Sequence, residues 1–194
     1  MHPSKRSLII PREHGTPRTS VGDGDRSAMR EDPDVILVGE MRDADTISMA
    51  MTAAETGHLV LGTLHTTGAV KTIDRIIDAL PGELREQTKS FLSQSLKAVV
   101  TQVLVKTPDG RGRKAMMEIL VNNRAISKLI MSDQTHQIPS QLQMGRDVGM
   151  QLMDQALLAA IKNNEVDPDD AFRYATEKKR FQRFVTDSSI LPVI

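Results

Sequence analysis

Two short apolar runs, separated by a segment with helical periodicity, constrain the fold of this chain more than any other feature. Residues 35–38 (VILV) and 59–64 (LVLGTL) lack the alternation of half-exposed strands, which predicts strands buried on both faces. Between them, Asp43 is placed to cap a helix and Gly57 to end it. A connection that holds one helix favours a right-handed βαβ crossover, so we expect two parallel strands.

A polar side chain follows each of the two expected strands. Glu40 follows the first strand and His65 follows the second. The carboxyl ends of parallel strands open on the same edge of a sheet, where open α/β sheets bind ligands. Glu40 could polarise a water molecule and His65 could donate a hydrogen bond to a developing anion, which are the groups that phosphoryl transfer needs. The alternative interpretation is that Glu40 caps a loop and His65 packs at the end of a strand.

The overall charge and composition exclude several classes of protein. The 194 residues carry 25 basic and 25 acidic side chains and no cysteine, so no net field attracts nucleic acid and no disulfide framework is expected. No apolar run approaches the length of a membrane span, and the first residues do not form a signal peptide. We expect a soluble cytoplasmic protein with no nucleic-acid partner, no direct insertion into a membrane and no metal-ligand cluster.

The remainder of the chain predicts helices around one hairpin. The hairpin turn carries Arg111 and Arg113, which could reach the phosphates of a neighbouring subunit or form a solvated tip. Thr66 or Thr67 could cap the helix that follows, and the amide-rich end of that helix would favour a bound anion. The expected elements are helices over 68–80 and 83–97, strands over 99–106 and 114–121, and a helical bundle over 122–194.

Two long motifs resemble those of a known family. ILVGEMRD, residues 36–43, resembles the Walker B segment of the type II/type IV secretion ATPase superfamily (GspE/PilT), and GHLVLGTLHTTGA, residues 57–69, resembles its His box. Together they look most like the PilT-type branch, the twitching-motility ATPases that retract type IV pili. The resemblance implies an α/β fold, with a partial RecA-like P-loop NTPase sheet followed by a C-terminal all-helical bundle. The expected domains are an irregular segment over 1–30, a partial ATPase core over 31–121 and a helical domain over 122–194.

The same resemblance implies ATP and Mg²⁺ as cofactors and assigns roles to individual side chains. Glu40 would be the catalytic carboxylate that activates water, and His65 would sense or stabilise the γ-phosphate. His58 would lie near the nucleotide, although it could instead complete a turn. The remaining implied contributors are Arg42, which would hold the local turn, and Thr66 and Thr67, which would lie beside the nucleotide.

The implied partners are those of a ring-shaped motor. Family subunits form hexamers that bind nucleotide between the domains of adjacent protomers, and they engage a pilus platform protein in the inner membrane. The resemblance therefore implies a homo-oligomer, or a ring shared with a full-length secretion ATPase, with peripheral attachment to the inner membrane through partners.

Some parts of the family pattern are missing from the sequence. No G-x-x-x-x-G-K-[ST] segment (Walker A) exists in the chain, and this segment is what holds the phosphates and magnesium. Asp25 and Gly24 stand where the family has a leucine and an alanine, and Ser127 and Lys128 depart from its AIRNLI motif. We therefore expect no ATP hydrolysis by this chain alone. The alternative is a non-catalytic interaction module or split-gene remnant that assembles with a full-length ATPase, and in either case an open sheet edge would favour self-association.

Overall fold

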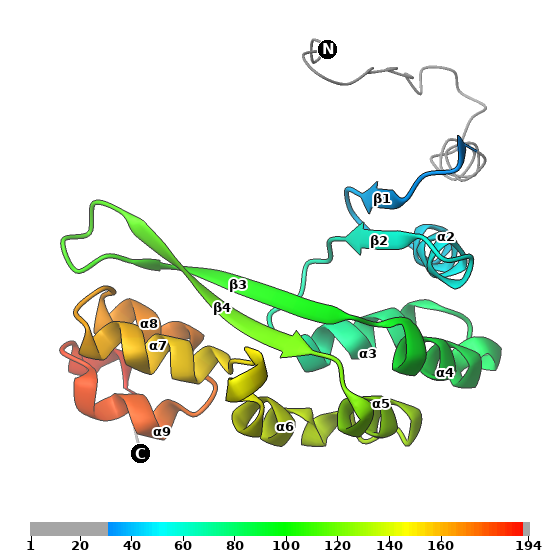
Figure 1. The fold of residues 1–194 in the computed structure, drawn as a ribbon. Helices are drawn as coiled ribbons and strands as arrows, with labels where there is room; N and C mark the ends of the chain where they lie inside the picture. Colours follow the sequence, from blue (N-terminus) through cyan, green and yellow to red (C-terminus); the bar gives the residue numbers. More distant parts are fainter. Residues whose placement is uncertain (1–30, 192–194) are drawn as a thin grey trace, which may run out of the picture. The chain divides into compact units, whose positions relative to one another are not determined.

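The computed structural model describes residues 31–191. The chain divides into two compact units, residues 1–64 and 65–194, and the described residues are divided between them at residue 64. Figure 1 shows the described helices and strands. The expectations for residues 1–30, including the positions of Gly24 and Asp25, lie outside the described residues.

The first unit contains the predicted strand, helix and strand. Strand β1 (Val35–Val38), helix α2 (Ala44–Glu55) and strand β2 (Leu59–Gly62) follow one another along the chain. The two strands pair in parallel, from Val35 opposite Leu59 to Val38 opposite Gly62. This confirms the predicted parallel βαβ unit.

The ends of α2 are formed by the two residues that the sequence indicates. The Asp43 side chain accepts a hydrogen bond from the Thr46 backbone N–H at 2.8 Å, as an N-cap does. Gly57 follows the helix with a φ of 102°, a conformation in which a residue without a Cβ is favoured.

The prediction that both strands are buried on both faces is wrong. One face of the pair is open, with Leu37 73% and Leu61 50% exposed beside Val35 and Leu59. The opposite face is better buried, since Val38 is only 7% exposed and α2 packs on β2. A continuous apolar run shows that a strand tolerates burial on both sides, but burial also requires an element to cover each side. In the described part of this unit, no element covers the face of Leu37 and Leu61.

The second unit is built on a long antiparallel hairpin (Figure 1). Strands β3 (Ala98–Lys106) and β4 (Arg113–Val121) pair along their whole length, which confirms the predicted hairpin. Alternate residues of β3 are buried, from Val99 to Val105, because helices pack on one face of the hairpin. The helices that contact that hairpin most are α3 (Ala69–Ala79), α7 (Met153–Lys162) and α8 (Pro168–Tyr174).

The chain after β4 is helical, as predicted. A hydrophobic cluster centred on Phe181, which is fully buried, joins one end of the hairpin to the last helices. The core of this cluster includes Leu157 and Phe172 as well as Val105 from the hairpin. The remaining helices of this region are α5 (Arg124–Met131), α6 (Ile138–Met144) and α9 (Lys178–Phe181).

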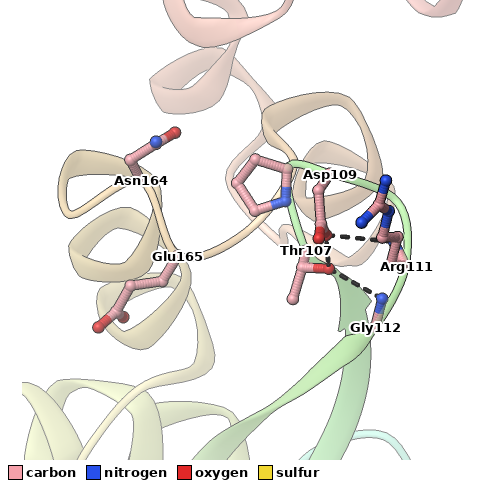
Figure 2. A pocket seen from close by; sticks show the side chains of 7 residues that line it. Thr107, Asp109, Arg111, Gly112, Asn164 and Glu165 are labelled. Carbon is pink, nitrogen blue, oxygen red and sulfur yellow. Dashed lines mark hydrogen bonds between the residues drawn. The ribbon is translucent and has the colours of Figure 1, made fainter.

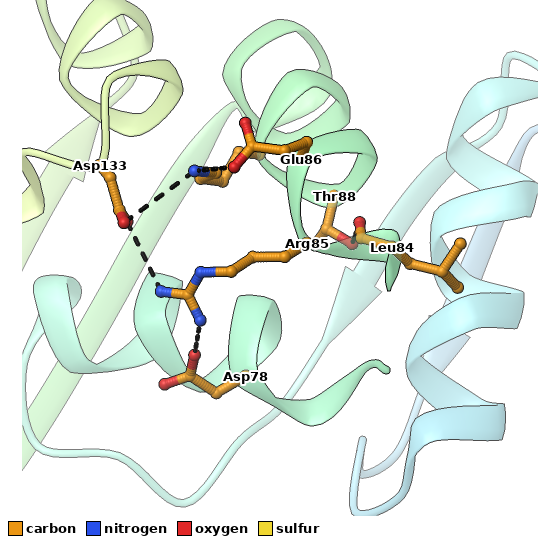
Figure 3. A network of polar contacts seen from close by, with 7 residues as sticks. Asp78, Leu84, Arg85, Glu86, Thr88 and Asp133 are labelled. Atoms are coloured by element: carbon orange, nitrogen blue, oxygen red, sulfur yellow. Dashed lines mark hydrogen bonds and ion pairs between the residues drawn. The ribbon is translucent and has the colours of Figure 1, made fainter. Parts of the chain in front are cut away.

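Helix α4 (Arg85–Ser95) buries only part of the set of residues that its apolar pattern predicts. The apolar residues Leu84 and Leu92 both predict an inward face; Leu92 is buried as predicted, but Leu84 is 41% exposed, whereas Lys89 is 5% exposed. The Lys89 ammonium lies 2.6 Å from Glu86, and Arg85 bridges Asp78 of α3, at 2.5 Å, and Asp133, at 3.6 Å (Figure 3). A lysine stem can be buried in this way because its charged end reaches carboxylates.

The described helices are each too short or too polar to cross a membrane.

Candidate functional site

The backbone pairing of β1 and β2 continues past the ends of both strands, and Glu40 lies in this extension. The Met41 N–H donates to the Thr63 carbonyl at 2.9 Å, and the Thr63 hydroxyl donates to the Gly39 carbonyl. Glu40 therefore lies at the carboxyl edge of the strand pair, where the sequence predicts it, with its backbone fixed on both sides.

The carboxylate of Glu40 is paired with Arg42 across a single residue. The Arg42 Nη2 and Glu40 Oε2 atoms are 2.6 Å apart, and the two side chains are 76% and 24% exposed. The hydrogen bond and charge of Glu40 raise the pKa of Arg42 further above its ordinary value. An exposed pair of this kind adds little stability.

His58 lies at the other end of the first unit's strands. Its Nδ1 atom is 2.9 Å from the Ala53 carbonyl and 3.0 Å from the Thr56 hydroxyl, so the ring closes the C-terminus of α2. His58 directly precedes β2, whereas Glu40 directly follows β1. Because the strands are parallel, the structure does not bring His58 and Glu40 to the same edge.

His65, Thr66 and Thr67 are the first residues of the second unit. His65 and Thr67 are exposed, and the Thr66 hydroxyl lies 2.7 Å from the Thr72 hydroxyl. The N-cap of α3 is Gly68, with a φ of 137° and no side-chain hydrogen bond. The prediction that Thr66 or Thr67 caps this helix is therefore wrong, because the turn bonds Thr66 to the helix side chain Thr72.

The acceptor at the start of α3 is a residue that the sequence did not indicate. Glu118 of β4 accepts the Ala69 N–H at 2.7 Å. A capping carboxylate 49 positions away leaves no local sequence signal. It also means that the amide-rich end of α3, which was expected to favour a bound anion, already contacts a carboxylate.

The hairpin tip forms a hydrogen-bonded turn with exposed cations. Asp109 accepts the Thr107 hydroxyl at 2.5 Å and the Arg111 N–H at 3.1 Å, and these bonds lower the pKa of Asp109. Arg113 donates to the Leu104 carbonyl at 3.4 Å. The tip borders a hollow of about 610 Å³ whose other wall holds Asn164 and Glu165 (Figure 2). Within residues 31–191, no three His, Cys, Asp or Glu side chains group as metal ligands would.

Comparison with known proteins shows that the sequence matches a known family. Residues 12–180 match the family described as type II/IV secretion system protein. The twitching motility protein of Neisseria gonorrhoeae is 53% identical over 175 residues, which cover 90% of this chain and 47% of that protein. The type IV pilus retraction ATPase PilT of Pseudomonas aeruginosa is 45% identical over 181 residues, covering 93% of this chain and 52% of the relative.

A solved structure gives the same result for the fold. The crystal structure of the pilus retraction motor PilT with bound ADP matches with a TM-score of 0.78 and 42% identity, over 89% of this chain and 48% of that chain. This similarity confirms the α/β fold as a partial RecA-like ATPase core followed by helices. The chain spans about half the length of the relatives that it matches, and it belongs to the type II/IV secretion system protein family, with PilT and the twitching motility proteins among its relatives.

Proposed function

We propose that this chain is the C-terminal portion of a PilT-like motor ATPase, in which Glu40 and His65 act on the terminal phosphate of ATP. Relatives that are about half identical over nine-tenths of the chain are named as twitching-motility proteins and pilus-retraction ATPases. That similarity supports the assignment of the chain to the same type of motor.

The observation that carries this proposal is the backbone hydrogen bond that joins the segments just after β1 and β2. Met41 is bonded to Thr63 at 2.9 Å, and His65 follows Thr63 by two residues. Consecutive Cα atoms are about 3.8 Å apart, so the chain itself limits how far the His65 backbone can lie from that of Thr63. We assign to Glu40 the orientation of the attacking water and to His65 a hydrogen bond to the developing anion.

The other predicted contributors take supporting parts in the proposal. Arg42 orients the Glu40 carboxylate through their ion pair. Thr66 and Thr67 line the nucleotide side of the turn before α3, while His58 closes the end of α2.

The groups that hold the phosphates are not supplied by a Walker A segment of these 194 residues. The 194 residues contain no G-x-x-x-x-G-K-[ST] segment, so we assign the binding of the phosphates and Mg²⁺ to polypeptide outside these residues. Turnover depends on positioning as much as on the reactive groups. We therefore expect no turnover from these residues alone.

The proposed assembly is a hexameric ring in the cytoplasm, formed with copies of the chain or with a full-length secretion ATPase. Peripheral attachment to the inner membrane would then occur through a pilus platform protein. In such a ring, ATP turnover would drive retraction of a type IV pilus.

A second function, that of a non-catalytic interaction module, is favoured by one specific observation. The open face of the first unit groups four apolar side chains, with exposed fractions from 48% to 73%. Apolar faces of this kind commonly mark contacts with other proteins. The four residues are Val35, Leu37, Leu59 and Leu61.

A complementation assay distinguishes the two functions. The purified chain would be mixed with a full-length family member whose own matching catalytic glutamate is replaced by glutamine, and ATP turnover of the mixture would be measured. The proposed function predicts that the wild-type chain restores turnover, and that Glu40→Gln restores at least about 100-fold less.

Glu83→Gln serves as the matched control, because Glu83 is an exposed glutamate outside the candidate site, and it should restore turnover fully. Equal restoration by Glu40→Gln would overturn the role of Glu40. Copurification with the full-length protein, without restored turnover and without ATP binding, would establish the interaction module instead.

A further inference from the structure

Helices α3 and α7 of the second unit begin without a side-chain cap of their own. Helices α3 and α7 have Gly68 and Leu152 at the N-cap position, and neither makes a side-chain hydrogen bond to the helix. Helices α2, α5 and α8, by contrast, are capped by a local Asp or Asn side chain. The first N–H groups of a helix need an acceptor, so α3 and α7 must find theirs elsewhere.

A single carboxylate on β4 serves both helices. Glu118 Oε1 accepts the Ala69 N–H at 2.7 Å, and Glu118 Oε2 accepts the Met153 N–H at 3.2 Å. Ala69 is the first residue of α3 and Met153 is the first residue of α7. The N-termini of two helices thus meet at one carboxylate, and the geometry is that of a shared N-cap.

The two helices are anchored to the hairpin to different degrees. Gln151, just before α7, exchanges backbone hydrogen bonds of 2.8 and 2.9 Å with Ile119 of β4, and its side chain donates to the Met117 carbonyl at 2.8 Å. The start of α7 is therefore fixed on β4 by several bonds. The start of α3 follows the exposed turn 65–68, and Glu118 is the side chain that bonds its first N–H to β4.

We propose that Glu118 is a positioning residue, which sets the start of α3 and thereby ties the turn that carries His65, Thr66 and Thr67 to the N-terminus of α7. The importance of this link for ATP rests on the proposed function, in which the turn faces the nucleotide. A displacement of the turn would then be transmitted through Glu118 to α7 and the C-terminal helices.

Amide hydrogen exchange of the purified chain tests the link without nucleotide. Glu118→Gln keeps the shape of the side chain but replaces one acceptor oxygen with an NH₂ group, so it can no longer accept from both helices. We expect exchange at Ala69 to rise by about tenfold or more, and exchange at Met153 to rise less, because the start of α7 keeps its bonds to Ile119.

Asp154→Asn is the matched control. Asp154 accepts the N–H groups of Thr176 and Glu177, each at 2.8 Å, so it joins two backbone amides in the same unit without touching α3. The control should raise exchange at Thr176 and Glu177 and leave residues 65–70 unchanged. A general loss of stability would instead raise exchange at both places in both variants.

A second readout separates positioning from stability. In the complementation assay, Glu118→Gln should lower kcat about tenfold with KM within about threefold, because misplacement of a reacting group affects the transition state more than binding, while Asp154→Asn should change neither. Unchanged exchange at both Ala69 and Met153 in Glu118→Gln would overturn the positioning role. Since exchange needs no nucleotide, that result is independent of any failure of the proposed function.

Discussion

The two paired-strand regions of this protein differ in how they are covered. The β3–β4 hairpin has one face sealed by helices, with Val105 and Leu120 fully buried, while Val100 on its other face is 60% exposed. The β1–β2 pair has one face on which Leu37 is 73% exposed. Both regions are rich in apolar residues, so composition does not account for the difference. What differs is the supply of helices, because α3, α7 and α8 pack on the hairpin while α2 packs on the strand pair.

We therefore expect the sealed region, which is the helix-covered face of the hairpin, to contribute more to stability than the open region, which is the exposed face of the β1–β2 pair. Burial of apolar area is the main favourable term in folding. Changes in the sealed cluster should therefore have large effects, and changes on the open face should have small ones.

The largest expected effect is in the cluster around Phe181. Phe181→Ala removes a fully buried ring and should lower the free energy of unfolding of the second unit by about 3–5 kcal/mol. Urea denaturation followed by circular dichroism measures this change. A loss below about 1 kcal/mol would show that the sealed region is not the stable one.

The next effect is at the junction before α3. Gly68 has a φ of 137°, which a residue with a Cβ adopts only under strain, so Gly68→Ala should lower the stability by about 1–3 kcal/mol. The matched control is Gly39→Ala in the open region, where an added Cβ meets nothing within 4 Å. Comparable losses in the two variants, measured by urea denaturation, would contradict the difference between the regions.

Acid should destabilise both regions through capping carboxylates. Hydrogen bonds from Thr186 lower the pKa of Asp169, and those from Thr46 lower the pKa of Asp43. A carboxylate whose folded pKa lies below its unfolded value of about 3.9 contributes stability that is present above that value and is lost as the pH falls through the folded pKa. The melting temperature, measured at a series of pH values from 7 to 2, should therefore stay nearly constant down to about pH 4 and decrease at lower pH.

Asparagine variants show which carboxylate causes the loss of stability in acid. Asp169→Asn should flatten the pH dependence of the second unit, and Asp43→Asn that of the first. A pH profile identical to wild type in both variants would show that other groups cause the acid loss.

The smallest effect is expected on the open face. Leu37→Ala should change the free energy of unfolding by less than about 0.5 kcal/mol, as exposed substitutions usually do, while reducing self-association measured by analytical ultracentrifugation. A loss above about 2 kcal/mol in dilute solution would show that this face is covered, and the comparison with the hairpin would fail.

Local signals made most of the fold predictable. Asp43 marks the start of a helix because its side chain caps the first turn, and Gly57 marks its end. The alternation from Val99 to Val105 indicates a strand with one buried face. These signals involve neighbouring residues, so the sequence displays them directly. The parallel pairing of β1 and β2 was also predictable, because a single intervening helix favours it.

The features that the sequence did not predict depend on contacts between residues far apart in the chain. The exposure of Leu37 depends on which elements cover a face, and the burial of Lys89 depends on carboxylates in place around it. Within the candidate site, the place of Glu40 at the end of β1 followed from the sequence. The role of Glu118 did not, because its partners Ala69 and Met153 are 49 and 35 positions away.

The central claim is that Glu40 and His65 serve one nucleotide. It is tested most directly by assembling the isotope-labelled chain with the unlabelled full-length family member of the complementation assay, adding Mn²⁺–ATP, and following paramagnetic broadening of the NMR signals of the labelled chain. The account predicts that the Met41 amide, next to Glu40, and the His65 ring broaden together at the same concentration, while the His58 ring broadens less. Broadening of only one of the first two signals, or of neither, would contradict it.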